Sequence, residues 1–175
     1  MGFPFCNALL PMNRFPVLAF LLAAVTSTVV AKTPADAATI AVAHNLQQDA
    51  ALARRAGQPL LIVFTAPDCG YCDRVIDYYL KPMQREPAAK RTAVIRQMDL
   101  TGTGPLVDFA GKATTPADYA RRLDVTFAPT VIVFTPDGTP AGRRLVGLSS
   151  EDYYGGYMDA AIAAGRSAMR TSGVR

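Results

Sequence analysis

The sequence predicts an α/β fold in which helices flank a central mixed β-sheet. Two apolar runs, 60–64 and 130–134, have the composition of strands, and the second is a continuous β-branched run typical of a strand buried on both faces. The first run leads through a short loop into a helical pattern. The second is followed by Pro-Asp-Gly turn chemistry at 136–138 and a further strand, which indicates an antiparallel hairpin.

Length and composition indicate one globular domain. The chain has 175 residues, of which 50% are apolar, enough for a substantial core. The net charge is +4, and basic residues are dispersed in pairs such as Arg54-Arg55 and Arg143-Arg144 rather than gathered in one block. Dispersed pairs are typical of solvated surface, so no nucleic-acid partner is expected.

Residues 1–31 have the pattern of a cleavable secretory signal peptide. Arg14 precedes an apolar run at 15–25, and Val29-Val30-Ala31 ends with small residues at the positions that precede a signal-peptidase cut. The run is shorter than the roughly 20 residues that a membrane anchor needs. We therefore expect a mature protein that begins near Lys32 and is located in the periplasm.

The leader also affects the start codon and the cysteine count. Met12 lies closer to the leader's arginine than Met1 does, and either methionine is a candidate for the true start. Cleavage would remove Cys6, so only Cys69 and Cys72 would remain. In an oxidising compartment these two can pair only with each other or with a partner protein.

The predicted domain spans residues 39–165 and follows a short Pro/Ala linker at 32–38. From the start of the domain, apolar residues recur at helical spacing until Gly57 and Pro59, which predicts a packing helix before the first central strand. The lone histidine, His44, lies on this helix, and no chemistry is assigned to it.

The middle of the chain alternates helical and strand patterns. The helix that follows the cysteines should kink or end at Pro82. Residues 92–99 suit a strand, and 101–105 form a Gly/Pro loop. Residues 106–114 fit no single pattern, and a helical turn is one interpretation.

The last third contains the remaining elements. Thr115-Pro116-Ala117-Asp118 has an N-cap hydroxyl, a proline at the first helical position and an early acid, which predicts a helix start. After the 130–134 strand, 143–146 should return as its hairpin partner. A final helix is predicted over 151–164, with Gly165 as its stop and 166–175 as a flexible tail.

The strongest chemical signal is the segment Cys69-Gly70-Tyr71-Cys72. This spacing at a helix N-terminus puts both sulfurs on one face, and the unpaired N–H groups and the helix dipole favour the thiolate of the first cysteine. A zinc site would need four ligands, and the chain offers only Cys6 and His44 besides the pair. A purely structural disulfide closing so small a loop would stabilise little. The segment therefore predicts a redox-active pair.

The order strand, Cys-x-x-Cys helix, strand, helix, proline-led strand, hairpin and final helix resembles the thioredoxin fold over about residues 39–164. Members of that family place a cis-proline, usually followed by threonine, beside the cysteines, and Ala128-Pro129-Thr130 stands at the matching position. The resemblance implies that Pro129 is cis, that the Ala128 backbone pairs with a substrate strand, and that Tyr71, Pro129 and Thr130 line a binding groove. The alternative is an ordinary trans proline that opens a strand.

The sequence departs from thioredoxins proper at two positions. Val63 replaces the buried carboxylate of the strand before the cysteines, and Asp68 replaces the tryptophan before the first one, so the usual proton acceptor for Cys72 is missing. The Cys-Gly-Tyr-Cys motif is similar to that of periplasmic disulfide isomerases and of reductases in sulfur-oxidation and cytochrome-maturation systems. The isomerases carry an extra dimerisation domain, for which 32–58 leaves no room, so a monomer is expected.

The resemblance implies a periplasmic thiol-disulfide oxidoreductase that reduces, or isomerises, protein disulfides. Cys69 would attack and Cys72 would resolve the mixed disulfide. Asp68 would either raise the pKa of the Cys69 thiol or relay a proton for Cys72, and a helix-capping role is the alternative. The expected partners are periplasmic protein disulfides and a membrane thiol electron donor, and no cofactor is expected.

Two other function classes use the same residues. The two thiolates would suit Cu(I), as in a metallochaperone-like module, although copper carriers of related fold usually add a distant histidine and His44 is the only one here. A chaperone that used the groove alone would not need its cysteines.

Overall fold

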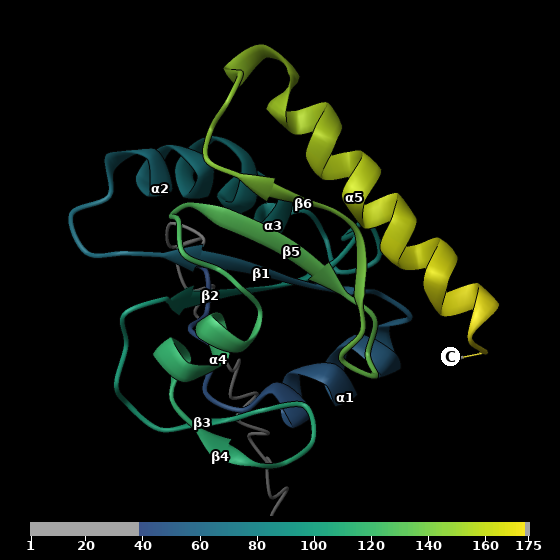
Figure 1. Cartoon of the computed structure of the whole chain (residues 1–175). Coiled ribbons are helices and arrows are strands. Elements are labelled where there is room, and N and C mark those ends of the chain that lie inside the picture. The colour runs from purple at the N-terminus through teal and green to yellow at the C-terminus, as the bar shows by residue number, and fades with distance from the viewer. Residues whose placement is uncertain (1–38, 174–175) are drawn as a thin grey trace, which may run out of the picture. The chain divides into compact units, whose positions relative to one another are not determined.

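The computed structural model describes residues 39–173, and its centre is a mixed β-sheet with helices on both faces (Figure 1). The strands lie in the order β2-β1-β5-β6. Strand β1 pairs in parallel with β2 and antiparallel with β5, and β5 pairs antiparallel with β6. The predicted α/β fold with a mixed sheet is therefore confirmed. The bounds are β1 Leu60–Thr65, β2 Val94–Asp99, β5 Thr130–Phe134 and β6 Pro140–Val146.

The helices divide between the two faces of this sheet (Figure 1). One face carries α1 (Leu46–Ala56) and α4 (Pro116–Arg122). The other carries the helix that follows the cysteines and the long C-terminal helix α5 (Glu151–Thr171). The helix after the cysteines consists of α2 (Gly70–Val75), the π-helical segment η1 (Ile76–Leu80) and α3 (Lys81–Arg85).

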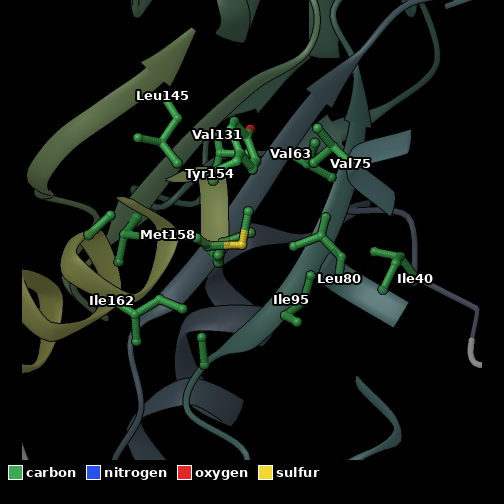
Figure 2. Packing of buried hydrophobic residues seen from close by; sticks show 14 residues of the cluster. Ile40, Val63, Val75, Leu80, Ile95, Val131, Leu145, Tyr154, Met158 and Ile162 are labelled. Atoms are coloured by element: carbon green, nitrogen blue, oxygen red, sulfur yellow. The ribbon is translucent and has the colours of Figure 1, made fainter. Parts of the chain in front are cut away.

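Strand β1 lies in the middle of the sheet, and all of its residues are buried. Because side chains alternate along a strand, Leu61 and Val63 point to the α5 side, while Leu60, Ile62 and Phe64 point to the α1 side. Each set joins a separate apolar cluster, and Figure 2 shows the one on the α5 side. Because β1 packs into both apolar clusters, the start of the loop that follows it is held in a fixed place.

The N-terminal helix begins later than its apolar spacing suggests. Ala43 donates its amide to the Gln97 carbonyl at 2.9 Å, and the Gln97 amide donates to Ala41 at 2.9 Å, so this segment pairs with β2 as an extended chain. Helix α1 starts only after Asn45, whose side chain accepts from the Gln48 amide at 3.0 Å. The predicted helix from residue 39 is therefore wrong over its first two turns, residues 39–45.

The segment 106–114 forms a small second sheet instead of a helical turn. Strands β3 (Leu106–Val107) and β4 (Ala113–Thr114) pair antiparallel. Between them, the Asp108 carboxylate accepts from the amides of Ala110 at 3.0 Å and Lys112 at 2.9 Å. These bonds to one buried side chain form the turn.

The helix after the cysteines changes its hydrogen bonding before the proline. The Lys81 amide donates to the Ile76 carbonyl, a π-type bond at the end of η1. Pro82 then stands in the first turn of α3, where the N–H that proline lacks is not needed for a helical hydrogen bond. The predicted kink at Pro82 is thus a local π segment, and helical structure continues to Arg85.

The final helix passes through the position that was expected to end it. Helix α5 continues to Thr171, so the predicted stop at Gly165 and the flexible tail from residue 166 are wrong. A Cβ at Gly165 would stand 2.7 Å from Val133 Cγ1 and 3.0 Å from Pro59 Cβ. This glycine allows α5 to approach the sheet closely.

The predicted leader, the linker and the alternative start Met12 lie outside the described residues. Among the described helices, none has the length and apolarity needed to cross a bilayer.

Candidate active site

The two cysteines of the motif form a disulfide at the start of α2. Their Cα atoms are 5.2 Å apart. Strand β1 ends at Thr65, and the chain then leaves the sheet through 66–68 to reach Cys69. Cys69 is half-buried, whereas only 2% of Cys72 is exposed. The pair is therefore asymmetric, with one sulfur near solvent and the other inside.

The first cysteine is itself the N-cap of the helix. The Cys69 carbonyl accepts from the amides of Cys72 at 2.9 Å and Asp73 at 3.2 Å, and the Cys72 amide lies 3.2 Å from Cys69 Sγ. An amide that donates to this sulfur, added to the positive end of the helix, stabilises negative charge there. The site is therefore arranged for a Cys69 thiolate once the disulfide is reduced.

Asp68 stands outside the helix start. It is exposed and has a left-handed backbone with φ of 53°. The helix-capping alternative for this residue is wrong, because Cys69 occupies the cap position. A carboxylate at the surface is also poorly placed to serve the buried Cys72.

The proline loop borders the same end of the sheet. The Ala128–Pro129 peptide bond is cis, as the resemblance implied. Thr130 pairs with Phe64 near the end of β1, which places Ala128 and Pro129 beyond that end, on the side where the chain continues to the cysteines. The Gly147 amide donates to the Pro129 carbonyl at 2.8 Å. Ala128 is half-buried, and Pro129 is buried.

The remaining predicted groove residues differ in exposure. Tyr71 is 61% exposed, so it is available to a partner. Thr130 is 2% exposed, and its hydroxyl donates to the Phe127 carbonyl at 2.6 Å, so its side chain supports the loop. Phe127 is 59% exposed and is not among the groove residues that the sequence predicts. Its only sequence signal is an aromatic residue directly before the Ala-Pro pair.

Within residues 39–173, no buried carboxylate takes the place of the one that is missing at Val63. Val63 is fully buried in the apolar cluster on the α5 side. The buried acids among residues 39–173 are Asp49 and Asp108, which pair with Arg96 at 2.6 Å and Arg122 at 2.9 Å. Burial raises the pKa of Asp49, and the Arg96 guanidinium opposes this rise. Both pairs belong to the α1 side or the small sheet, not to the face below the cysteines.

A metal site beyond the two cysteines is not evident in the described part of the chain. Within it, no group of three or more His, Cys, Asp or Glu side chains is arranged to hold a metal ion. His44 is exposed, and its carbonyl accepts from the Val107 amide at 3.0 Å, which places it next to the small sheet.

Fold and site together define a thioredoxin-like thiol-disulfide oxidoreductase with a redox-active cysteine pair. A family model described as a thioredoxin-like domain matches residues 46–162, and the chain belongs to this family.

Solved structures give a weaker likeness. The chain is 22% identical to mitochondrial thioredoxin 3 from Saccharomyces cerevisiae in its oxidised form, covering 69% of this chain and 94% of that one with a TM-score of 0.45. It is 22% identical to the reduced periplasmic thioredoxin SoxS from Paracoccus pantotrophus, covering 61% and 98% with a TM-score of 0.42. A poplar thioredoxin h is 19% identical, covering 67% and 94% with a TM-score of 0.45. No curated protein matches.

Proposed function

We propose that this protein is a periplasmic reductase of protein disulfides, in which Cys69 attacks and Cys72 resolves. The main support for this proposal is the asymmetry of the pair: Cys69 caps the helix and is half-buried, while Cys72 is 2% exposed. A substrate sulfur can approach only the outer cysteine. The inner one is then left to displace the product.

The exchange consists of two thiolate attacks. The Cys69 thiolate attacks one sulfur of a substrate disulfide, forms a mixed disulfide and releases the other substrate sulfur as a thiolate. The Cys72 thiolate then attacks Cys69 Sγ, closes the internal disulfide and releases the second substrate sulfur, which takes up a proton. The substrate gains two electrons, and a membrane thiol donor returns them to the pair.

The surface around Cys69 supports a protein substrate. Tyr71 and Phe127 are exposed aromatic side chains on the two segments that border the site. The backbone of Ala128 would pair with an extended substrate segment, with Pro129 and Thr130 holding that backbone in place. Aromatic side chains beside an accessible strand-like backbone suit an unfolded or extended polypeptide.

The reducing direction follows from the charges near the motif. Gly70 and Tyr71, between the cysteines, bring no positive charge, and Asp68 adds an exposed carboxylate next to Cys69. A strong oxidant requires a highly stabilised thiolate. In the part of the chain that the structure describes, the helix end and one amide alone supply that stabilisation.

Reduction of insulin by a thiol donor tests this function. We expect the Cys6→Ser protein, in which only the motif cysteines remain, to accelerate precipitation of the insulin B chain, and both Cys69→Ser and Cys72→Ser to be inactive. An unaccelerated reaction, together with tight retention of Cu(I) by the reduced protein, would instead support the copper-binding alternative. Full activity of both serine variants in a chaperone assay would support the groove-only alternative.

The proposed compartment has its own test. N-terminal sequencing of the protein from a periplasmic fraction should give Lys32 as the first residue. Recovery of the unprocessed chain in the cytoplasm would contradict the periplasmic assignment.

A further inference from the structure

Tyr154 carries a buried hydroxyl that the mechanism above does not use. The side chain is 1% exposed. Among the described residues its hydroxyl is the one buried side-chain polar group without a hydrogen-bond partner. Buried polar groups are nearly always paired, because an unpaired one has lost its bonds to water, so this exception needs an explanation.

The hydroxyl lies on the sheet face below the cysteine helix. Tyr154 belongs to the same apolar cluster as Val63, Val75 and Val131. Figure 2 draws Tyr154, whose oxygen is the red atom, with Val131 and Val63 of this cluster. These two valines are register partners in β1 and β5, next to the ends from which the chain continues to the cysteines and to the cis-proline.

Cys72 lies on the same face of its helix as the residues that pack against this apolar cluster. Residues three and four apart share a helix face, so Cys72 lies one turn before Val75 and Ile76. Val75 is fully buried in the cluster, and Ile76 packs against it. Cys72 is 2% exposed, so it lies on the buried side of the helix, as Val75 does.

We infer that the Tyr154 hydroxyl is the hydrogen-bond donor to the Cys72 thiolate during the resolving step. Tyr154 lies in the same apolar cluster as Val63, the residue that stands where thioredoxins carry a buried carboxylate. In the oxidised protein the Cys72 sulfur is in the disulfide and is a weak acceptor, so the hydroxyl stays unpaired. In the mixed disulfide Cys72 is free, and its thiolate is a strong acceptor.

The chemistry differs from that of a buried base. Burial raises the pKa of Tyr154 to about 12, with the neighbouring Tyr79 adding to the rise, so the hydroxyl keeps its proton and acts as a donor. The Cys72 proton leaves to solvent, the thiolate attacks Cys69 Sγ, and the substrate sulfur departs. Tyr154 lowers the Cys72 pKa and is not itself consumed.

Few other ionisable groups compete for this role. Apart from Tyr154 and the partly buried Tyr79, the α5-side cluster contains only apolar side chains. The Tyr79 hydroxyl instead donates to the Glu151 carbonyl at 2.7 Å. Near the motif, Asp68, Asp73 and Arg74 are exposed.

This inference rests on the proposed exchange reaction, and stopped-flow reaction with the chromogenic disulfide DTNB separates the two. In a Cys6→Ser background, attack by Cys69 releases one thionitrobenzoate at a rate that depends on reagent concentration. Resolution by Cys72 releases the second at a rate that does not. Loss of the second phase in Cys72→Ser tests the exchange reaction itself.

The Tyr154→Phe variant, which removes only the hydroxyl, tests the inference through the pH profile of the second phase. We expect its apparent pKa to rise by about one unit or more, because a bond to the thiolate is lost. Below that pKa, resolution should slow about three- to fourfold per unit. Above it, the variant should be as fast as or faster than the parent, because a more basic thiolate is the better nucleophile.

The first phase should not change in Tyr154→Phe, and Tyr79→Phe should leave both phases unchanged. The oxidised Tyr154→Phe protein should melt at the same or a higher temperature than the parent, since it loses an unpaired buried group. A second-phase profile that superimposes on the parent's would overturn the inference. So would a lower melting temperature, because it would show that the hydroxyl is already paired in the oxidised protein.

Discussion

The backbone amide of Cys72 lies 3.2 Å from Cys69 Sγ, so the buried cysteine supplies a hydrogen bond to the half-buried one through its own main chain. This bond strengthens when Cys69 becomes a thiolate, since charged acceptors form stronger bonds. It makes Cys69 the better-stabilised thiolate of the pair and therefore the attacking one. The division of labour between the two cysteines follows from it.

Substitution of each cysteine should therefore give different trapping. Cys72→Ser keeps the attacking thiolate and removes the resolving one, so Cys69 should accumulate in mixed disulfides with substrates. Cys69→Ser should trap none, because the remaining sulfur is 2% exposed. Non-reducing gels of cell extracts measure this. Equal trapping by the two variants would contradict the assigned roles.

The carboxylate of Asp68 should influence the couple only slightly. Asp68 is exposed and lies next to Cys69, so its charge disfavours the thiolate through solvent-screened repulsion. Asp68→Asn should make the couple more oxidising by about 5–20 mV, measured against glutathione buffers. Asp73→Asn, which removes an exposed carboxylate from the first turn of α2, is the comparison variant. A change toward the reducing side, or a large loss of the resolving rate in Asp68→Asn, would favour the proton-relay role instead.

Two glycines of α5 should respond oppositely to alanine. A Cβ at Gly165 would stand 2.7 Å from Val133 Cγ1, whereas a Cβ at Gly156 would meet nothing within 4 Å. Gly165→Ala should destabilise by about 1–3 kcal/mol through overpacking. Gly156→Ala should stabilise by roughly 1 kcal/mol through helix propensity. Urea unfolding of the oxidised protein gives both values, and destabilisation of equal size in both would show that packing does not distinguish them.

Tyr154 should also make the fold sensitive to alkali. Its pKa is raised from 10.0 to about 12 by burial, so the stability that its proton provides is complete below pH 10 and is lost as the pH rises toward 12. The free energy of unfolding should fall over this window, and Tyr154→Phe should remove about 2 kcal/mol of that fall. Burial also raises the pKa of Tyr119, which would continue to contribute in the variant. An unchanged slope in Tyr154→Phe would show that Tyr154 ionises normally.

Continuous strands and short-range turn and cap signals were predictable because their causes are local. The run 130–134 and the cap at Thr115, which accepts from the Asp118 amide at 3.1 Å, depend on neighbouring residues alone. The extended segment at Ala41 and Ala43 was not predictable, because its hydrogen bonds go to Gln97 in a distant strand. The prediction that the last helix ends at Gly165 was wrong for the same reason, because contact with the sheet outweighs the weak helix propensity of glycine.

The candidate site shows a similar division. The spacing of Cys69 and Cys72 is enough to predict the disulfide pair. The cis bond before Pro129 was predicted from the resemblance to thioredoxins. The Tyr154 hydroxyl is invisible in the sequence, because an aromatic residue on the apolar face of a helix is ordinarily a core residue. Only the folded chain places it, unpaired, in the apolar cluster that also contains Val75 of the cysteine helix.

The reduction potential of the Cys69–Cys72 couple decides whether the protein is built to reduce or to oxidise its substrates. Equilibration of the purified Cys6→Ser protein with glutathione buffers gives the potential from the fraction of reduced pair. We predict a value between about −180 and about −270 mV, because among the described residues the helix end and one amide alone stabilise the Cys69 thiolate. A value near the strong-oxidant level of about −120 mV would contradict the assignment as a reductase.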